Sequence, residues 1–279
     1  MITTLKLWLN TIATTFTNSG ALIVFAIIYL LLLLASYFFI STREATFGQV
    51  FVTYALMIVI PALFFIYQAA IIDRIRDGKF RWRAIGLDAV RCFLATIPLL
   101  LIAWLLYYLL NKLAVRYPAP AISLLPQTQG PPKPAPLHWP SLIFASLKFV
   151  LLGVALPLAA IHLWVEVASC NLRESLRGGA RSIFNRLGRR FACAFGSESV
   201  LIYALGLVFF FVLPYTVLFL PFTPKGNKTD FTVFILRLLL TYIFSLIGWV
   251  VTVSALARVN PEPVPVASVA TAQPVEAAA

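Results

Sequence analysis

The sequence predicts an all-α polytopic membrane protein with six transmembrane helices and interfacial amphipathic helices. Three observations support this prediction: a mean hydropathy of +0.92, long apolar runs that recur along the chain, and Lys and Arg residues placed beside those runs. Because 61% of the 279 residues are hydrophobic and 11% are charged, polar surface is too scarce to cover a water-soluble globule. We expect lipid to surround a single domain formed by residues 1–258.

The chain begins with a short amphipathic segment, residues 1–19. Its larger apolar side chains recur at spacings of three and four, as on one face of a helix: Leu5, Trp8, Leu9 and Ile12. We expect an interfacial helix that leads into the first span, with Trp8 at the depth of the lipid head groups.

Six apolar runs follow, each close to the roughly 20 residues that a bilayer core about 30 Å thick requires. The first run has no charged residue and is longer than the apolar core of a cleaved secretory signal, so we expect it to be retained. The expected spans are 21–40, 47–72, 92–110, 141–165, 200–222 and 231–257. Four contain a proline, which we interpret as a packing kink rather than a gate: Pro61, Pro98, Pro157 and Pro214.

Positive charge is concentrated in two connections, 73–91 and 166–199, and is sparser in the three connections on the other side. Lys and Arg beside short loops mark the cytoplasmic side. We therefore expect both connections, and with six spans both termini, to face the cytoplasm. The connection 117–140 holds eight prolines and is expected to be an extended outer loop, and the tail 259–279 is expected to be disordered.

The segment 179–195, GARSIFNRLGRRFACAF, concentrates four arginines in this apolar chain. If it is helical, its apolar side chains share one face and its arginines occupy the others, so it can lie flat on lipid. Each basic residue contributes about 1 kcal/mol near an anionic surface. The alternative is that these residues only set the topology. The candidates for lipid head-group contact are Arg181, Arg186, Arg189, Arg190, Lys79, Arg81 and Arg83.

The two basic connections share a pattern, in which a glycine turn and a basic stretch lead into a cysteine. Gly78 to Cys92 and Gly179 to Cys193 have equal separations, which suggests a parallel duplication over 73–91 and 171–193. The stretch GGARSIFNRLGRRFACAFGSESVLIYALGL resembles the membrane domain of bacterial glycerophosphodiester phosphodiesterases and related inner-membrane proteins. The resemblance covers residues 47–222, includes no catalytic motif, and implies a bacterial inner-membrane location and no activity.

Four ionisable residues within or beside the spans form a possible intramembrane polar site: Lys148, Arg237, His162 and Glu166. Lys148 and Arg237 lie near the expected outer ends of their spans, so they either reach the head groups or line an outward anion cavity. His162 and Glu166 are four residues apart on one helical face. We favour a structural pair over a proton relay or half of a metal site.

No catalytic or cofactor motif accompanies these residues, so we expect no enzyme activity, no cofactor and no metal. The aspartates of 73–91 alternate with arginines, which predicts local ion pairs. A net charge of +12 beside apolar spans favours membrane lipids over nucleic acid, and the three cysteines are expected to be free thiols.

The leading hypothesis is a non-enzymatic membrane protein that organises or regulates through a basic cytoplasmic face. This face would contact anionic lipid or a membrane or cytoplasmic protein partner. The alternative is a transporter or channel for an anionic or lipid-like substrate, and an intramembrane lipid enzyme ranks third.

Overall fold

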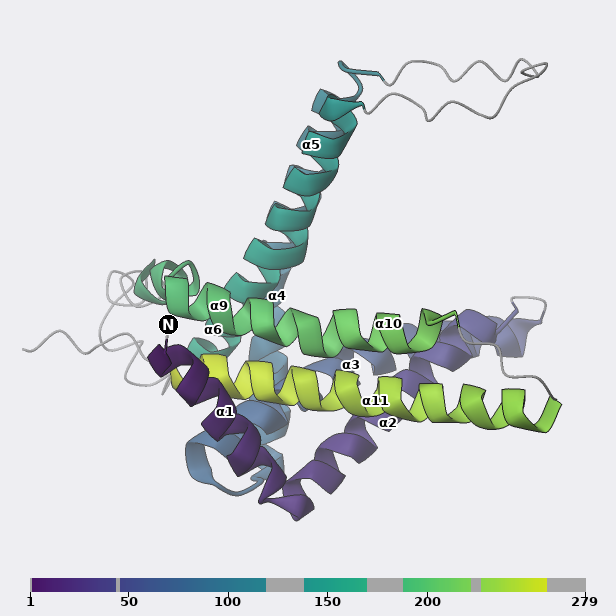
Figure 1. Cartoon of the computed structure of the whole chain (residues 1–279), viewed down its shortest axis with the longest axis vertical. Coiled ribbons are helices and arrows are strands. Elements are labelled where there is room, and N and C mark those ends of the chain that lie inside the picture. Colours follow the sequence, from purple (N-terminus) through teal and green to yellow (C-terminus); the bar gives the residue numbers. More distant parts are fainter. Residues whose placement is uncertain (1, 44–45, 119–137, 170–187, 222–226, 260–279) are drawn as a thin grey trace, which may run out of the picture.

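The computed structural model describes residues 2–43, 46–118, 138–169, 188–221 and 227–259, and over these residues it contains helices and no strand (Figure 1). The all-α prediction is therefore confirmed. Within these ranges, six helices are long and apolar enough to cross a membrane, and the chain is a multi-pass membrane protein. The elements are α1 (Ile2–Phe16), α2 (Ser19–Ser41), α3 (Phe47–Asp77), α4 (Trp82–Ala114), α5 (Trp139–Lys148), η1 (Phe149–Ala155), α6 (Leu156–Ser169), α9 (Ser197–Leu207), η2 (Val208–Val212), α10 (Leu213–Phe219) and α11 (Asn227–Arg258).

The helices extend beyond the apolar runs that predicted them. Helix α3 begins at a capping box between Thr46 and Gln49 and ends at Gly78, whose φ of 69° is left-handed. Because α4 begins at Trp82, the basic connection 73–91 is mostly helical instead of a loop. Most of the Pro-rich connection, the tail from residue 260 and the segment 170–187 lie outside the described residues.

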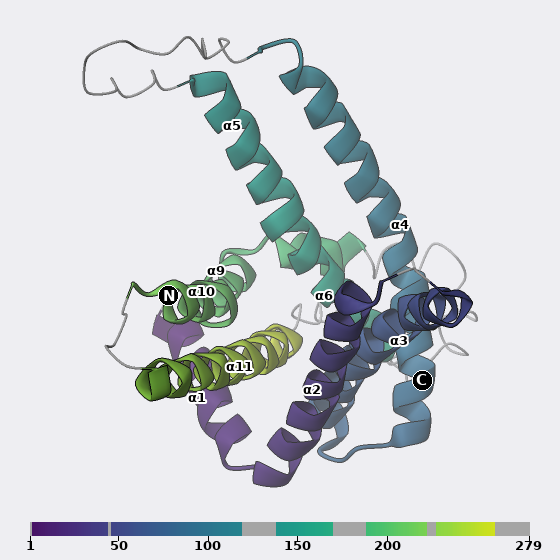
Figure 2. The ribbon, with the colours of Figure 1, turned by 90° about the vertical axis from the view of Figure 1, so that its right-hand side faces the viewer.

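The packed core lies at one end of the helices, where α3 is followed by α4. Buried side chains cluster between Phe65 and Asp73 of α3, Leu158 and Ala168 of α6, and Val250 and Leu256 of α11. Farther from this end, side chains such as Trp104 and Leu101 are exposed. Figures 1 and 2 show the hairpin of α4 and α5 pointing away from α10 and α11, which lie side by side.

We call this packed end the arginine-rich end and define it as residues 73–91, 166–169 and 188–199 together with α1 and residues 254–259. Helix α1 packs against α11, and the Arg258 guanidinium donates to the hydroxyl of Thr11 at 3.3 Å. Helix α11, the last in the described part of the chain, also packs against α2, α3, α6, α9 and α10. The first and last described helices therefore meet at the same end of the molecule.

Helix α1 divides its apolar stripe between the protein and the outer surface. Trp8 is 4% exposed and its ring lies 4.9 Å from that of Phe209, whereas Leu5 and Leu9 are exposed. The depth of Trp8 in the bilayer stays a prediction. Because lipid solvates apolar side chains, the buried face of α1 carries Trp8 with the polar Thr4 and Thr11.

A π-helical segment precedes the proline in each of the two interrupted helices, η1 before Pro157 and η2 before Pro214. Proline has no backbone N–H, so Pro157 leaves the carbonyl of Gly153 without its usual α-helical donor. The hydroxyl of Tyr203 on α9 donates to that carbonyl at 3.1 Å. The neighbouring helix thus satisfies the group that the proline frees.

The substitution Tyr203→Phe is expected to lower the free energy of unfolding by about 1 kcal/mol, because it leaves the Gly153 carbonyl without this donor. Thermal unfolding of the full chain in detergent measures the effect. In a Pro157→Ala background, where the backbone N–H is restored, the same substitution should cost markedly less. Equal losses in the two backgrounds would show that the hydroxyl does not compensate for the proline.

Candidate functional site

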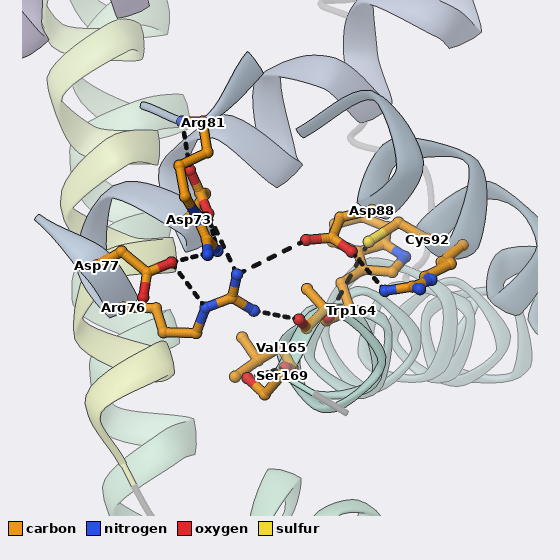
Figure 3. Close-up of polar contacts among 11 residues, drawn as sticks. Asp73, Arg76, Asp77, Arg81, Asp88, Cys92, Trp164, Val165 and Ser169 are labelled. Atoms are coloured by element: carbon orange, nitrogen blue, oxygen red, sulfur yellow. Dashed lines mark hydrogen bonds and ion pairs between the residues drawn. The ribbon is translucent and has the colours of Figure 1, made fainter. Parts of the chain in front are cut away.

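Six charged side chains form an ion-pair network at the arginine-rich end, which we call the Asp73 cluster: Asp73, Arg76, Asp77, Arg81, Asp88 and Arg91 (Figure 3). The left-handed turn at Gly78 brings Arg81 back over Asp73. The backbone N–H of Arg81 donates to Asp73 at 2.9 Å, and its guanidinium donates to the same carboxylate at 2.7 Å. Arg81 also pairs with Asp77.

Arg76 connects the two halves of the Asp73 cluster. Its guanidinium donates to Asp73 at 3.2 Å, lies 3.9 Å from Asp88, and donates to the carbonyl of Ala168 on α6. Arg91 donates to Asp88 at 2.8 Å. The three aspartates are thus paired with three arginines, which confirms the local ion pairs that the sequence predicted. The cluster joins α3, α4 and α6.

Two carboxyls of the Asp73 cluster are buried, and both keep arginine partners. Asp73 is 1% exposed and accepts hydrogen bonds from the backbone and guanidinium of Arg81 and from Arg76. Asp88 is 4% exposed and accepts a hydrogen bond from Arg91. Asp73 has more donors than Asp88, so its negative charge is the better compensated of the two.

His162 and Glu166 do not pair with each other. His162 is buried, and its Nε2 lies 3.1 Å from the hydroxyl of Ser199. Glu166 accepts a hydrogen bond from Nε of Arg190 at 2.7 Å, and Arg190 also donates to the carbonyl of Val259 at 3.1 Å. These contacts hold the helical residues 188–194 and the end of α11 against α6.

The structure separates the other two members of the possible intramembrane site. Lys148 donates to the side-chain carbonyl of Asn111 at 2.5 Å and lies 5.5 Å from the ring centroid of Tyr107, which ties α5 to α4. Arg237 lies in α11. Neither residue lines the cavity among α1, α2, α3 and α11 or the cavity between α3 and α4. The geometry therefore does not bring the four predicted residues together.

The predicted lipid contacts fall into three groups. Arg181 and Arg186 lie outside the described residues. Arg81 and Arg190 make ion pairs with carboxylates of the protein. Lys79, Arg83 and Arg189 make no ion pair with any described residue, and Arg189 is exposed. Head-group contact stays a prediction for all seven.

A polar cavity of about 200 Å³ opens among α1, α2, α3 and α11, and the sequence did not single it out. Two arginines line it, Arg74 and Arg258, together with hydroxyl and amide side chains and the backbone of Gly78. The full lining is Thr14, Thr15, Asn18, Ala21, Leu22, Phe25, Ile71, Arg74, Ile75, Gly78, Val250, Ser254 and Arg258. Nothing in the sequence distinguished these two arginines from the others that set the topology.

A larger cavity of about 470 Å³ between α3 and α4 is lined almost entirely by apolar side chains, among them Met57, Phe65 and Phe93. A transporter of anions requires polar groups along its pathway, and this cavity offers none. Among the described residues, His, Cys, Asp and Glu side chains form no group of three that suits a metal ion.

Comparison of the chain with protein-family models, with curated proteins and with solved structures gave no match. The resemblance to the membrane domain of glycerophosphodiester phosphodiesterases stays a prediction from the sequence. The parallel duplication suggested by the equal spacing of the two glycine-to-cysteine stretches also stays untested, because most of the second stretch lies outside the described residues.

Proposed function

We propose that this integral membrane protein acts from its arginine-rich end, which faces the cytoplasm and binds anionic phospholipid head groups without catalysing a reaction. The observation that supports the proposal is the charge balance of 73–91. The Asp73 cluster neutralises Arg76, Arg81 and Arg91 within the protein. Arg74, Lys79 and Arg83 have no carboxylate partner among the described residues, so this end presents a surplus of positive charge.

This surplus is located where anionic head groups would lie. Positive charge next to transmembrane helices is typical of the cytoplasmic side, whose leaflet carries negative surface potential. The neighbouring Arg189 adds to the surplus on the other basic connection. The positive ends of these side chains would contact phosphates, while the apolar helices fix the protein in the bilayer.

The triple substitution Lys79→Gln, Arg83→Gln and Arg189→Gln is expected to weaken binding of phosphatidylglycerol about a hundredfold, at about 1 kcal/mol for each charge. Native mass spectrometry of the full chain in a neutral detergent, over a range of salt concentrations, measures the bound lipid. Binding to the unchanged protein should fall as salt rises, because exposed charges are screened.

The matched control removes three positive charges from the opposite end: Arg43→Gln, Lys112→Gln and Arg116→Gln. This control should retain phosphatidylglycerol as the unchanged protein does. If both triple variants lose lipid equally, net charge alone governs binding and the proposal is wrong. If neither loses it, the arginine-rich end is not a lipid-binding surface.

A further inference from the structure

We propose that the cavity among α1, α2, α3 and α11 binds a phosphate group between Arg74 and Arg258. This inference rests on the proposed function and deepens it, because it names one binding site at the arginine-rich end and the class of ligand that the site binds. The cavity is the place at the arginine-rich end where two positive side chains from distant parts of the chain converge on enclosed space.

The charges of the lining favour an anion. Arg74 and Arg258 both line the cavity, and no Asp or Glu does. Neither arginine makes an ion pair with any residue in the described ranges. Arg258 donates to the hydroxyls of Thr11 and Thr14 at 3.3 and 3.4 Å, and Arg74 lies 5.6 Å from the ring centroid of Phe80. Both guanidinium groups therefore keep donors for a ligand.

Two neutral polar side chains of the lining, Ser254 and Asn18, also keep hydrogen-bonding capacity for a ligand. Ser254 is 5% exposed, yet its hydroxyl makes no hydrogen bond with the described part of the chain. Ser254 lines the cavity, so this hydroxyl is free to donate to a ligand there. Asn18 precedes α2 and makes no side-chain capping bond, which leaves the positive end of that helix facing the cavity without a cap.

The size and shape of the cavity suit a phosphate ester. A volume of about 200 Å³ equals about six or seven water molecules at ~30 Å³ each. This space accommodates a phosphate and the first carbons attached to it. The lining also includes the apolar side chains Leu22, Phe25 and Val250, which suit the glycerol and upper acyl carbons of a lipid. A choline group would find no carboxylate here, so anionic head groups are preferred.

The test measures binding of dioctanoyl phosphatidylglycerol to the full chain in a neutral detergent by native mass spectrometry. We expect one retained lipid at high salt, and about tenfold weaker binding in Arg258→Gln and in Arg74→Gln, since each removes a charge-assisted contact. Dioctanoyl phosphatidylcholine should bind weakly to all variants. Arg116→Gln, just beyond the C-terminal end of α4, is the charge-matched control and should bind normally.

A second variant tests the enclosed space without changing charge. Ser254→Leu fills the cavity and should abolish the retained lipid. Because Ser254 is buried, the thermal unfolding of the Ser254→Leu variant is measured as well. If this variant does not fold, Arg258→Gln still tests the proposal, since Arg258 is exposed. Unchanged binding of phosphatidylglycerol and of inorganic phosphate in Arg258→Gln would overturn the proposal.

Competition identifies the source of the phosphate. If millimolar inorganic phosphate does not displace the retained lipid, the site takes a lipid head group. If phosphate displaces it and binds with the same dependence on Arg258, the site takes free phosphate. The two proposals can fail separately. Loss of lipid only in the triple variant of Lys79, Arg83 and Arg189 would support the proposed lipid-binding surface and contradict the cavity site. Loss of lipid only in the cavity variants would support the cavity site and contradict the surface.

Discussion

The substitution Asp73→Asn should lower the free energy of unfolding by about 2 to 3 kcal/mol. The side chain of Asp73 is fully buried and accepts hydrogen bonds from the backbone and guanidinium of Arg81 and from Arg76. Removing one partner of a buried ion pair leaves the other charge uncompensated, at a cost of about 3 to 5 kcal/mol. The side chain of Arg81 is half exposed, so water relieves part of that cost.

The loss of stability in the Asp73→Asn variant can be followed through Cys92, whose thiol is buried beside α6. In a chain carrying Cys170→Ser and Cys193→Ser, a maleimide should label Cys92 at a lower temperature when Asp73 is replaced. Asp77→Asn is the matched control, because Asp77 is partly exposed and should lose at most about 1 kcal/mol. Equal losses at the two aspartates would contradict the central role of Asp73.

The substitution Gly248→Val is expected to cost about 3 kcal/mol or more, because α11 approaches the backbone of η2 at this glycine. A Cβ atom at Gly248 would lie 2.7 Å from the backbone nitrogen of Phe210 and 2.8 Å from the carbonyl carbon of Phe209. Backbone cannot move aside as a side-chain end can, so the helices would have to separate. Thermal unfolding in detergent measures the loss.

Gly20→Ala provides the comparison, since a Cβ atom there has no neighbour within 4 Å. Alanine is the better helix former by up to about 1 kcal/mol, so this variant should be unchanged or slightly more stable. A Gly248→Val chain as stable as the Gly20→Ala chain would show that the contact between α11 and η2 does not determine packing.

The sequence predicted the six membrane helices because length and apolarity identify a span regardless of its neighbours. It did not predict which face of a helix points inward. Leu5 and Leu9 of α1 are exposed while Trp8 and Thr11 are buried, because a lipid environment removes the usual reason to bury leucine. Periodicity therefore found the helix α1 but not its packed face.

The ion pairs of 73–91 were predictable because they form between neighbours in the sequence. The left-handed turn at Gly78 returns Arg81 to Asp73 within the same connection. The cavity was not predictable, since Arg74 and Arg258 are far apart in the sequence and meet only through the packing of α3 and α11. The rule that places Lys and Arg on the cytoplasmic side does not distinguish arginines that pair with carboxylates from arginines that do not.

The position of α11 also has a consequence for biosynthesis. The buried residues Val250 to Leu256 of α11 complete a core whose other parts come from α1, α2, α3, α4, α6 and α9. During translation, these earlier helices enter the bilayer before α11 exists, and α3, α4 and α6 can already pack through the Asp73 cluster. A ribosome stalled before Asn227 would leave α9 and α10 without the helix against which they pack, and would deliver an incompletely assembled product to membrane quality-control proteases.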